Sequence, residues 1–187
     1  MVDFKKLKEL RNLSFGKAKD NLLFKYYWNE YLKEQTQQVY ELEICEAIDN
    51  LVSRVNYLER IDLKSNLETG VDICVGDICY IDFGETRLHE VGYQHMGLVL
   101  SIMNRKIFVV PFTGNQLKFV EAQSIDNPIG KRHLIQIPKL KGLTKKSVAI
   151  INDAKWINSA RVIDVKSHLH PESDLFQFIK QKVKDII

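Results

Sequence analysis

Proline and glycine are almost missing from the first part of this 187-residue chain. No proline occurs in residues 1–70, and glycine occurs there only at positions 16 and 70. These two residue types are the strongest breakers of regular structure and are common in turns. Their absence excludes a loop-rich fold for residues 1–70 and favours helices.

Cysteine is also scarce, and the usual signals of a secreted, membrane-spanning or metal-binding protein are missing. Cys45, Cys74 and Cys79 are odd in number and lack zinc-like spacing, which predicts reduced thiols in a cytoplasmic protein. The N-terminus has no apolar signal core, and no apolar window is long enough for a membrane span. No phosphate-cradling glycine loop or nucleophile elbow occurs, so we expect neither a metal nor a cofactor.

Apolar residues recur at helical spacing in three segments before residue 70. The segments 3–13, 17–35 and 36–62 are predicted to be helices, the third with Thr36 as its N-cap. The sequence Glu68-Thr69-Gly70 is typical of a linker. We therefore expect an N-terminal helical region over 1–70 and a second domain over 71–187.

After residue 70 the apolar period shortens towards two, which indicates strands. Asn104-Arg105 predicts a tight hairpin, and residues 173–187 predict an amphipathic C-terminal helix. Short strands with frequent turns favour an α+β fold, with a small bent sheet or β-barrel between the helical region and the C-terminal helix. The predicted strands are 72–82, 96–103, 106–112, 117–121, 132–137, 147–151 and 160–165.

The net charge of +3 is unevenly distributed along the chain. Residues 1–70 contain 11 Lys and Arg against 12 Asp and Glu, whereas residues 71–187 contain 16 against 12. The positive excess of the second domain is compatible with a phosphodiester partner. A solvated surface of mixed charge explains the same imbalance, so both interpretations stay open.

Four short motifs occur in order along the second domain. They are Gly-Asp-Ile-x-Tyr-Ile-Asp-Phe-Gly from Gly76, His89-Glu90 with Gly92-x-x-His95-Met96-Gly97, Val110-Pro111-Phe112-Thr113, and Gly142-Leu143-Thr144-Lys145-Lys146-Ser147-Val148. In this order and spacing they resemble the MazF/PemK family of endoribonuclease toxins, over roughly residues 74 to 187. The resemblance implies an SH3-like barrel that cleaves single-stranded RNA without a metal, by attack of the ribose 2′-hydroxyl. It also implies RNA and a cognate antitoxin of a type II toxin–antitoxin system as partners, and a homodimer.

The resemblance assigns candidate catalytic residues. His95 stands where the family has its active-site arginine, and Thr113 matches a threonine whose hydroxyl bonds the phosphate. His89 matches a histidine of some PemK-type members that is implicated in acid–base chemistry. Arg161 resembles a late basic position of the family, which Lys155 in Lys155-Trp156-Ile157 matches equally well. Histidine suits proton transfer because its pKa lies near working pH. The further residues expected to contact RNA are Arg87, Glu90, Gln94, Asn115, Lys155 and Trp156.

Each assignment has a purely structural alternative. His95 can simply begin a buried strand and bond a backbone carbonyl, and Thr113 can cap a turn. His89 can be an ordinary loop histidine, and Trp156 can belong to the core. Because arginine is replaced at position 95, a catalytically inactive RNA- or protein-binding module is the alternative to the endoribonuclease.

Overall fold

A computed structural model describes residues 3–13, 16–126 and 128–186 of the chain. It divides into two compact units, Met1–Asn50 and Leu51–Ile187. Within the described residues, no helix is long and apolar enough to span a membrane. The division into domains at residues 1–70 and 71–187, which the sequence suggests, stays a prediction.

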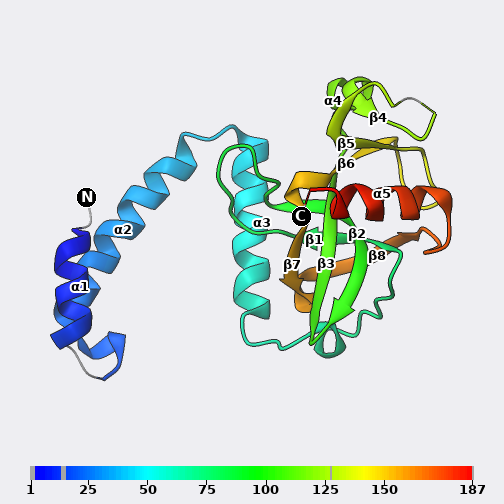
Figure 1. Ribbon diagram of the computed structural model, residues 1–187. Helices are drawn as coiled ribbons and strands as arrows, with labels where there is room; N and C mark the ends of the chain where they lie inside the picture. The colour runs from blue at the N-terminus through cyan, green and yellow to red at the C-terminus, as the bar shows by residue number, and fades with distance from the viewer. Residues whose placement is uncertain (1–2, 14–15, 127, 187) are drawn as a thin grey trace. The chain divides into compact units, whose positions relative to one another are not determined.

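The first unit is helical. It contains α1 (Phe4–Leu13), the short 3₁₀ helix η1 (Ala18–Asp20) and α2 (Leu22–Tyr40), which are drawn in blue in Figure 1. Asn21 caps α2, because its side-chain oxygen accepts a hydrogen bond from the Phe24 amide at 2.9 Å. No residue of α2 is buried, so this helix gains little from tertiary packing within its unit.

Helix α3 (Ile44–Arg60) begins in the first unit, and its part from Leu51 onward belongs to the second. The predicted break at Thr36 is wrong, because α2 continues through this residue to Tyr40. The residues from Glu34 to Gln38 include no glycine or proline, so nothing in the local sequence stops the helix there.

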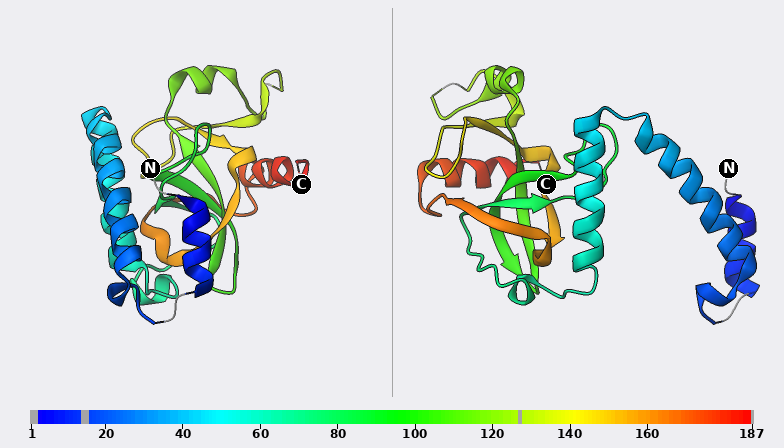
Figure 2. Two further views of the ribbon diagram at one scale, coloured as in Figure 1. Left: turned by 90° about the vertical axis from the view of Figure 1, so that its left-hand side faces the viewer. Right: turned by 180° about the vertical axis from the view of Figure 1, so that it is seen from behind.

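The second unit is built on one strongly bent sheet with the strand order β4-β5-β6-β3-β2-β1-β8 (Figures 1 and 2). Strand β3 produces much of the bend, because it pairs with β7 over its first half and with β6 at its end. The strands are β1 (Asp77–Asp82), β2 (Gln94–Met103), β3 (Lys106–Thr113), β4 (Ala122–Gln123), β5 (Lys131–Ile137), β6 (Ser147–Ile150), β7 (Lys155–Asn158) and β8 (Val162–His168).

Apolar side chains cover both faces of this sheet. One cluster contains Leu98, Val110 and Phe112 and is closed by α5 (Asp174–Lys184) through Phe176 and Ile179. The other contains Ile81, Val99, Val109 and Val148. Ser173 caps α5 by accepting a hydrogen bond from the Phe176 amide. The predicted α+β class, with N-terminal helices, a bent sheet and a C-terminal helix, is confirmed.

Several predicted strand boundaries need correction. Segment 117–121 is not a strand but part of α4 (Gln116–Glu121), because the Asn115 side chain accepts bonds from the amides of Leu117 and Lys118 and starts a helix. Strand β1 is shorter than predicted, and β7 is an additional strand. The hairpin at Asn104-Arg105 is confirmed: both residues have positive φ, at 49° and 65°, as a type I′ turn requires.

Candidate functional site

His95 and Thr113 lie on neighbouring strands and on the same face of the sheet. On β2, His95 pairs with Ile81 of β1, and on β3, Thr113 pairs with Val148 of β6. Both partners belong to the second apolar cluster, and residues directly opposite each other in a sheet share a face. The β2–β3 pairing ends with Gly97 opposite Pro111. His95 and Thr113 each lie two residues beyond this last pair, where β3 has turned to pair with β6.

The His95 ring is half-buried and oriented by the backbone. Its Nδ1 lies 2.9 Å from the carbonyl oxygen of Gly92. A carbonyl accepts but does not donate, so Nδ1 carries the hydrogen of this bond. The structure thus shows the carbonyl bond that the structural alternative predicts. The same bond fixes the tautomer, as an acid–base histidine also needs.

The residues at the end of β3 include a hydroxyl and lie beside a lysine. Thr113 is half-buried, and its Oγ1 accepts a hydrogen bond from the Asn115 amide at 3.3 Å. Lys145 lies against Gly114, the next residue: a Cβ atom built there would be 2.5 Å from the Lys145 Nζ. A side chain at position 114 would therefore displace this ammonium group from its place beside Gly114. The Asn115 side chain is itself engaged as the cap of α4.

Two of the predicted cationic residues contact Phe83, which directly follows β1. Arg161, in the 3₁₀ helix η4 (Ser159–Arg161), donates from Nη1 to the Phe83 carbonyl at 2.7 Å. Lys155 of β7 places its Nζ 5.8 Å from the centre of the Phe83 ring, within range for a cation–π interaction. The Phe83 ring also lies over Gly97, two residues after His95 on β2. Lys155 and Arg161 are thus held next to the β1–β2 corner.

The loop between β1 and β2 is closed at its base and tied at its sides. Hydrogen bonds of 2.7 Å join the Phe83 amide to the Tyr93 carbonyl and the Tyr93 amide to the Gly84 carbonyl. Glu85 forms an ion pair with Arg54 of α3, and the Val91 amide donates to Asp153. The loop is therefore attached to two other elements of its unit.

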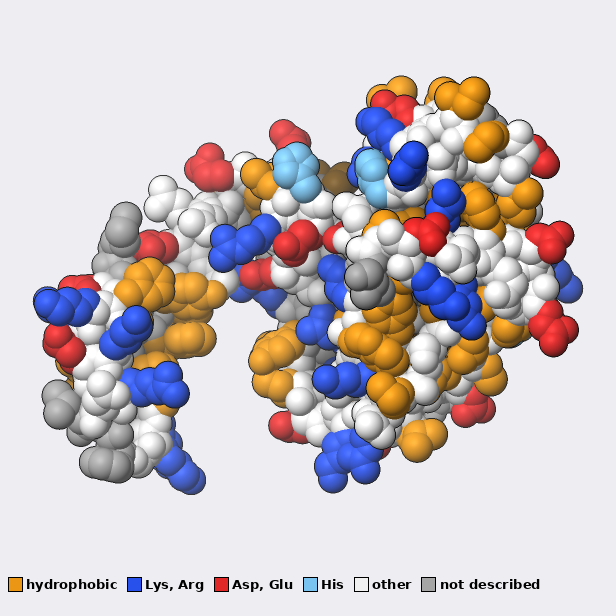
Figure 3. Space-filling view, in the orientation of Figure 1, with side chains coloured by type: hydrophobic (Ala, Val, Ile, Leu, Met, Phe, Trp, Pro, Cys, Tyr) orange, Lys and Arg blue, Asp and Glu red, His pale blue; other side chains and the backbone are white. Residues whose placement is uncertain are grey.

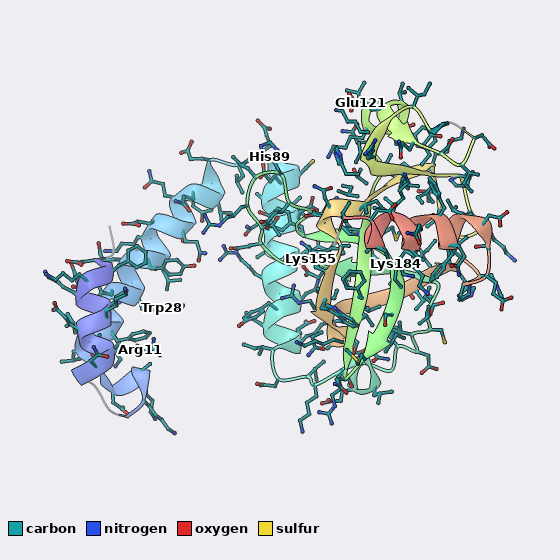
Figure 4. All side chains as sticks on the ribbon, in the orientation of Figure 1. Arg11, Trp28, His89, Glu121, Lys155 and Lys184 are labelled. Atoms are coloured by element: carbon teal, nitrogen blue, oxygen red, sulfur yellow. The ribbon has the colours of Figure 1, made fainter. Side chains whose placement is uncertain are left out.

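The structure does not bring His89 next to the Phe83 group. His89 is exposed, has a φ of 72° and lies at the outer end of the loop, apart from Lys155 (Figure 4). Arg87 and Glu90 share this loop and are exposed as well. Trp156 packs on Phe108 at a ring distance of 5.3 Å, on the opposite face of β7 from Lys155. Trp156 is thus separated from the other candidates.

Asp82 is a central residue of this region that the sequence analysis missed. It is 6% exposed and ends β1. Its Oδ1 accepts bonds from Ser53 Oγ at 2.7 Å and the Gly84 amide at 2.9 Å, and its Oδ2 accepts from Asn56 Nδ2 at 2.8 Å and Gln94 Nε2 at 3.2 Å. The predicted RNA contact Gln94 is therefore engaged here.

These hydrogen bonds determine the charge state of Asp82. Burial opposes ionisation, but the hydrogen bonds from Ser53, Asn56, the Gly84 amide and Gln94 together lower the pKa of the carboxyl below its ordinary value. The only advance signal was the position of Asp82 within the Ile-Asp-Phe-Gly motif. Its partners Ser53 and Asn56 lie almost thirty residues earlier, at distances in sequence of 29 and 26 residues, and no local pattern connects them.

A cavity of about 190 Å³ opens beside this group. Arg161 and Gly84 line it, whereas His95 and Thr113 do not. Its remaining lining residues are Ser53, Asn56, Tyr57, Arg60, Ile61, Leu63, Asp82, Asn158 and Ala160. Basic and acidic side chains are interspersed on the face seen in Figure 3, so the charge pattern alone does not identify a nucleic-acid groove.

No family model matches the sequence, and no curated protein matches it. The structure is similar to that of MazF (form I) from Deinococcus radiodurans, with a TM-score of 0.46 and 16% identity, over 61% of this chain and 94% of that chain. The MazE–MazF structure (form II) from the same organism gives a TM-score of 0.42 and 16% identity over the same shares. The Mycobacterium tuberculosis toxin MazF-mt6 gives 0.41 and 11% identity, over 58% of this chain and 93% of that chain. This chain is thus similar to MazF structures over about three fifths of its length.

Proposed function

We propose that this protein is a metal-independent endoribonuclease that cleaves single-stranded RNA. The observation that carries the proposal is the placement of His95 and Thr113 on one face of the sheet, each two residues beyond the last β2–β3 pair. Lys145 lies against Gly114, the residue after Thr113, and Lys155 and Arg161 are held at Phe83. Imidazole, hydroxyl and cationic groups are the ones that this cleavage needs.

The proposed reaction uses the nucleophile of the substrate. The ribose 2′-hydroxyl attacks the adjacent phosphorus while a base removes its proton, and the 5′-oxygen leaves with a proton from an acid. The products are a 2′,3′-cyclic phosphate and a 5′-hydroxyl. His95 exchanges the proton at Nε2, because Nδ1 is bonded to Gly92. Thr113 donates to a phosphoryl oxygen, and Lys145 offsets the charge that develops there.

The remaining predicted residues and partners belong to the same proposal. His89, Arg87 and Glu90 contact RNA from the β1–β2 loop, and His89 is the second candidate for proton transfer. In the cell, the protein acts as the toxin of a type II toxin–antitoxin pair, as a homodimer inhibited by its antitoxin in the cytoplasm. These assignments rest on the motif resemblance and on the exposure of the loop.

An RNA cleavage assay tests the proposal. The purified protein is incubated with mixed-sequence RNA in excess EDTA, and the new ends are analysed for cyclic phosphate and 5′-hydroxyl. We expect cleavage by the wild type and a loss of about 100-fold or more in His95→Ala and Thr113→Ala. His170→Ala, which changes a histidine near α5, is the matched control and retains activity. Cleavage that persists in both site variants would overturn the active-site assignment.

A second function, a catalytically inactive RNA-binding module, is favoured by one observation. Position 95 holds a histidine bonded to a backbone carbonyl where the resembled family has its active-site arginine. A module of this kind would bind RNA without producing new ends, and its expression would leave growth unaffected. A nuclease would arrest growth, and His95→Ala would relieve the arrest.

A further inference from the structure

The cavity beside Arg161 is built jointly by the helical segment and the sheet. Residues 53–63, at the end of α3 and just after it, form one wall, and Asp82, Gly84 and the corner at 158–161 form the other. The first wall lies outside the residues that resemble the MazF/PemK family. The cavity is thus a feature of this chain, and the proposed catalytic residues His95 and Thr113 take no part in it.

Hydrogen bonds hold both walls in place without a ligand. Arg60 donates from Nη1 to the carbonyls of Ala160 at 2.9 Å and Val162 at 2.7 Å. Asn158 donates to the Lys64 carbonyl at 3.2 Å and accepts from the Ala160 amide at 2.8 Å. A site whose walls are fixed in advance loses little conformational entropy when a ligand binds.

The lining suits a flat ring with apolar faces and hydrogen-bond acceptors at its edge. Ile61, Leu63 and the ring of Tyr57 supply apolar surface, with Tyr57 59% exposed. A guanidinium carries five N–H donors, and the bonds to backbone carbonyls use only Nη1 of Arg60 and of Arg161. Asp82, by contrast, already accepts four hydrogen bonds. The cavity therefore offers the remaining guanidinium N–H donors, next to the side-chain oxygens of Asn56 and Tyr57, which can accept.

The size of the cavity limits the ligand. Its volume of about 190 Å³ is below the roughly 300–1,000 Å³ of pockets for drug-sized molecules, so it suits a single heterocyclic base. Among the nucleobases, guanine presents two adjacent acceptors, O6 and N7, which are the usual partners of arginine. Arg161 connects this cavity to Phe83 and thus to the proposed RNA site.

We propose that the cavity binds one unpaired guanine base of an RNA strand, stacked on Tyr57 and held at its O6/N7 edge by Arg60 and Arg161. The proposal rests on the proposed RNA function for its ligand class. It makes α3 a specificity element, since Tyr57 and Arg60 select the base and lie outside the proposed catalytic residues.

Titration with nucleosides tests this site separately from cleavage. The full chain is titrated with guanosine, adenosine, cytidine and uridine, which carry no phosphate, and binding is followed by NMR chemical shifts. We expect guanosine to bind tightest, to shift resonances of residues 53–63, and to bind about tenfold more weakly to Tyr57→Ala, in the range for loss of one base–aromatic stack. Tyr40→Ala, an exposed tyrosine of α2, is the matched control and leaves the affinity unchanged.

The outcomes separate the two proposals. Guanosine binding in a protein that cleaves no RNA would support the cavity and overturn the nuclease. Cleavage by a protein that binds all four nucleosides equally, or whose guanosine affinity is unchanged by Tyr57→Ala, would overturn the guanine site and leave the nuclease in place. Shifts confined to residues outside the cavity would overturn it as well.

Discussion

Replacing Asp82 by asparagine tests a buried carboxylate of the second unit that accepts four hydrogen bonds. Each carboxylate oxygen accepts two hydrogen bonds: Oδ1 from Ser53 and the Gly84 amide, and Oδ2 from Asn56 and Gln94. An asparagine keeps one oxygen and replaces the other by an NH₂ group. With the neighbouring side chains oriented as they are for Asp82, two donors then face the new NH₂ group, so two of the four bonds are lost.

The loss can be estimated from hydrogen-bond energetics. A hydrogen bond to a charged group contributes about 1.5 kcal/mol or more, so two lost bonds at a site only 6% exposed give a destabilisation of about 3 kcal/mol. Urea-induced unfolding measures it, with an expected fall in the midpoint of about 1–2 M. Asp62→Asn, at an exposed position just after α3, is the control and leaves the midpoint unchanged.

The pH dependence gives the same prediction a second, independent test. The pKa of Asp82 is lowered in the folded state, so its ionised form stabilises the fold above the ordinary value of 3.8, and this contribution is lost as the pH falls through the folded-state value. The difference between wild type and Asp82→Asn should therefore be largest near about pH 7 and shrink below about pH 4. A loss under about 1 kcal/mol at neutral pH, or a difference that grows in acid, would refute the reasoning.

Two further predictions concern single residues of the second unit. Burial, and to a lesser extent the charges of Asp77 and Asp164, raises the pKa of the Cys79 thiol to about 12. Iodoacetamide at about pH 8 should therefore modify the exposed Cys45 and Cys74, and should modify Cys79 only in urea. Mass spectrometry measures which cysteines are modified. Gly76 has a φ of 96°, and a Cβ there would lie 2.4 Å from the Leu169 carbonyl oxygen. Gly76→Ala should therefore lower the free energy of unfolding, measured by thermal unfolding, by about 3 kcal/mol. Gly16 has a similar φ but open space around it, so Gly16→Ala should cost only about 1 kcal/mol. Modification of native Cys79, or equal costs for the two glycines, would contradict these accounts.

The sequence predicts local elements well because their signals are local. The alternation of apolar residues identifies β2 and β3, and the dipeptide Asn104-Arg105 marks their hairpin, in which both residues have positive φ. Ser173 lies in front of the amphipathic run that becomes α5. The same reasoning fails at 117–121, where the apolar content suggests a strand but the side chain of Asn115 starts a helix.

The sequence also predicts a shared location for part of the site, and for the same reason. His95 lies at the start of one strand and Thr113 at the end of the next, so the hairpin between them returns the chain to the same end of these strands. The structure adds Lys145, which lies against Gly114 from a loop about thirty positions later in the chain, and Lys155 on a strand that was not predicted. Such long-range neighbours depend on how the sheet bends, and the period of the sequence does not encode that bend.

The pattern of apolar residues does not predict how α3 is attached to the sheet. An amphipathic helix is expected to bury its apolar face, yet Leu51 and Leu58 of α3 are 60% and 72% exposed. The opposite, polar face forms the contacts with the sheet: Ser53 and Asn56 bond Asp82, and Arg60 bonds two backbone carbonyls.

The polar attachment of α3 bears on where the second unit begins. The side chains of residues 53 and 56 donate to the buried Asp82 carboxylate, and Arg60 donates to two carbonyls at the corner of the sheet. Removing these donors would leave the acceptors without these partners, and buried polar groups without partners cost free energy. The composition around Gly70 is typical of a linker. The sheet that follows Gly70 nevertheless accepts hydrogen bonds from residues that precede it in the chain. We therefore predict that the cooperative structure of the second unit begins before Gly70 and includes the end of α3, and unfolding of a chain truncated before Val71 would measure this.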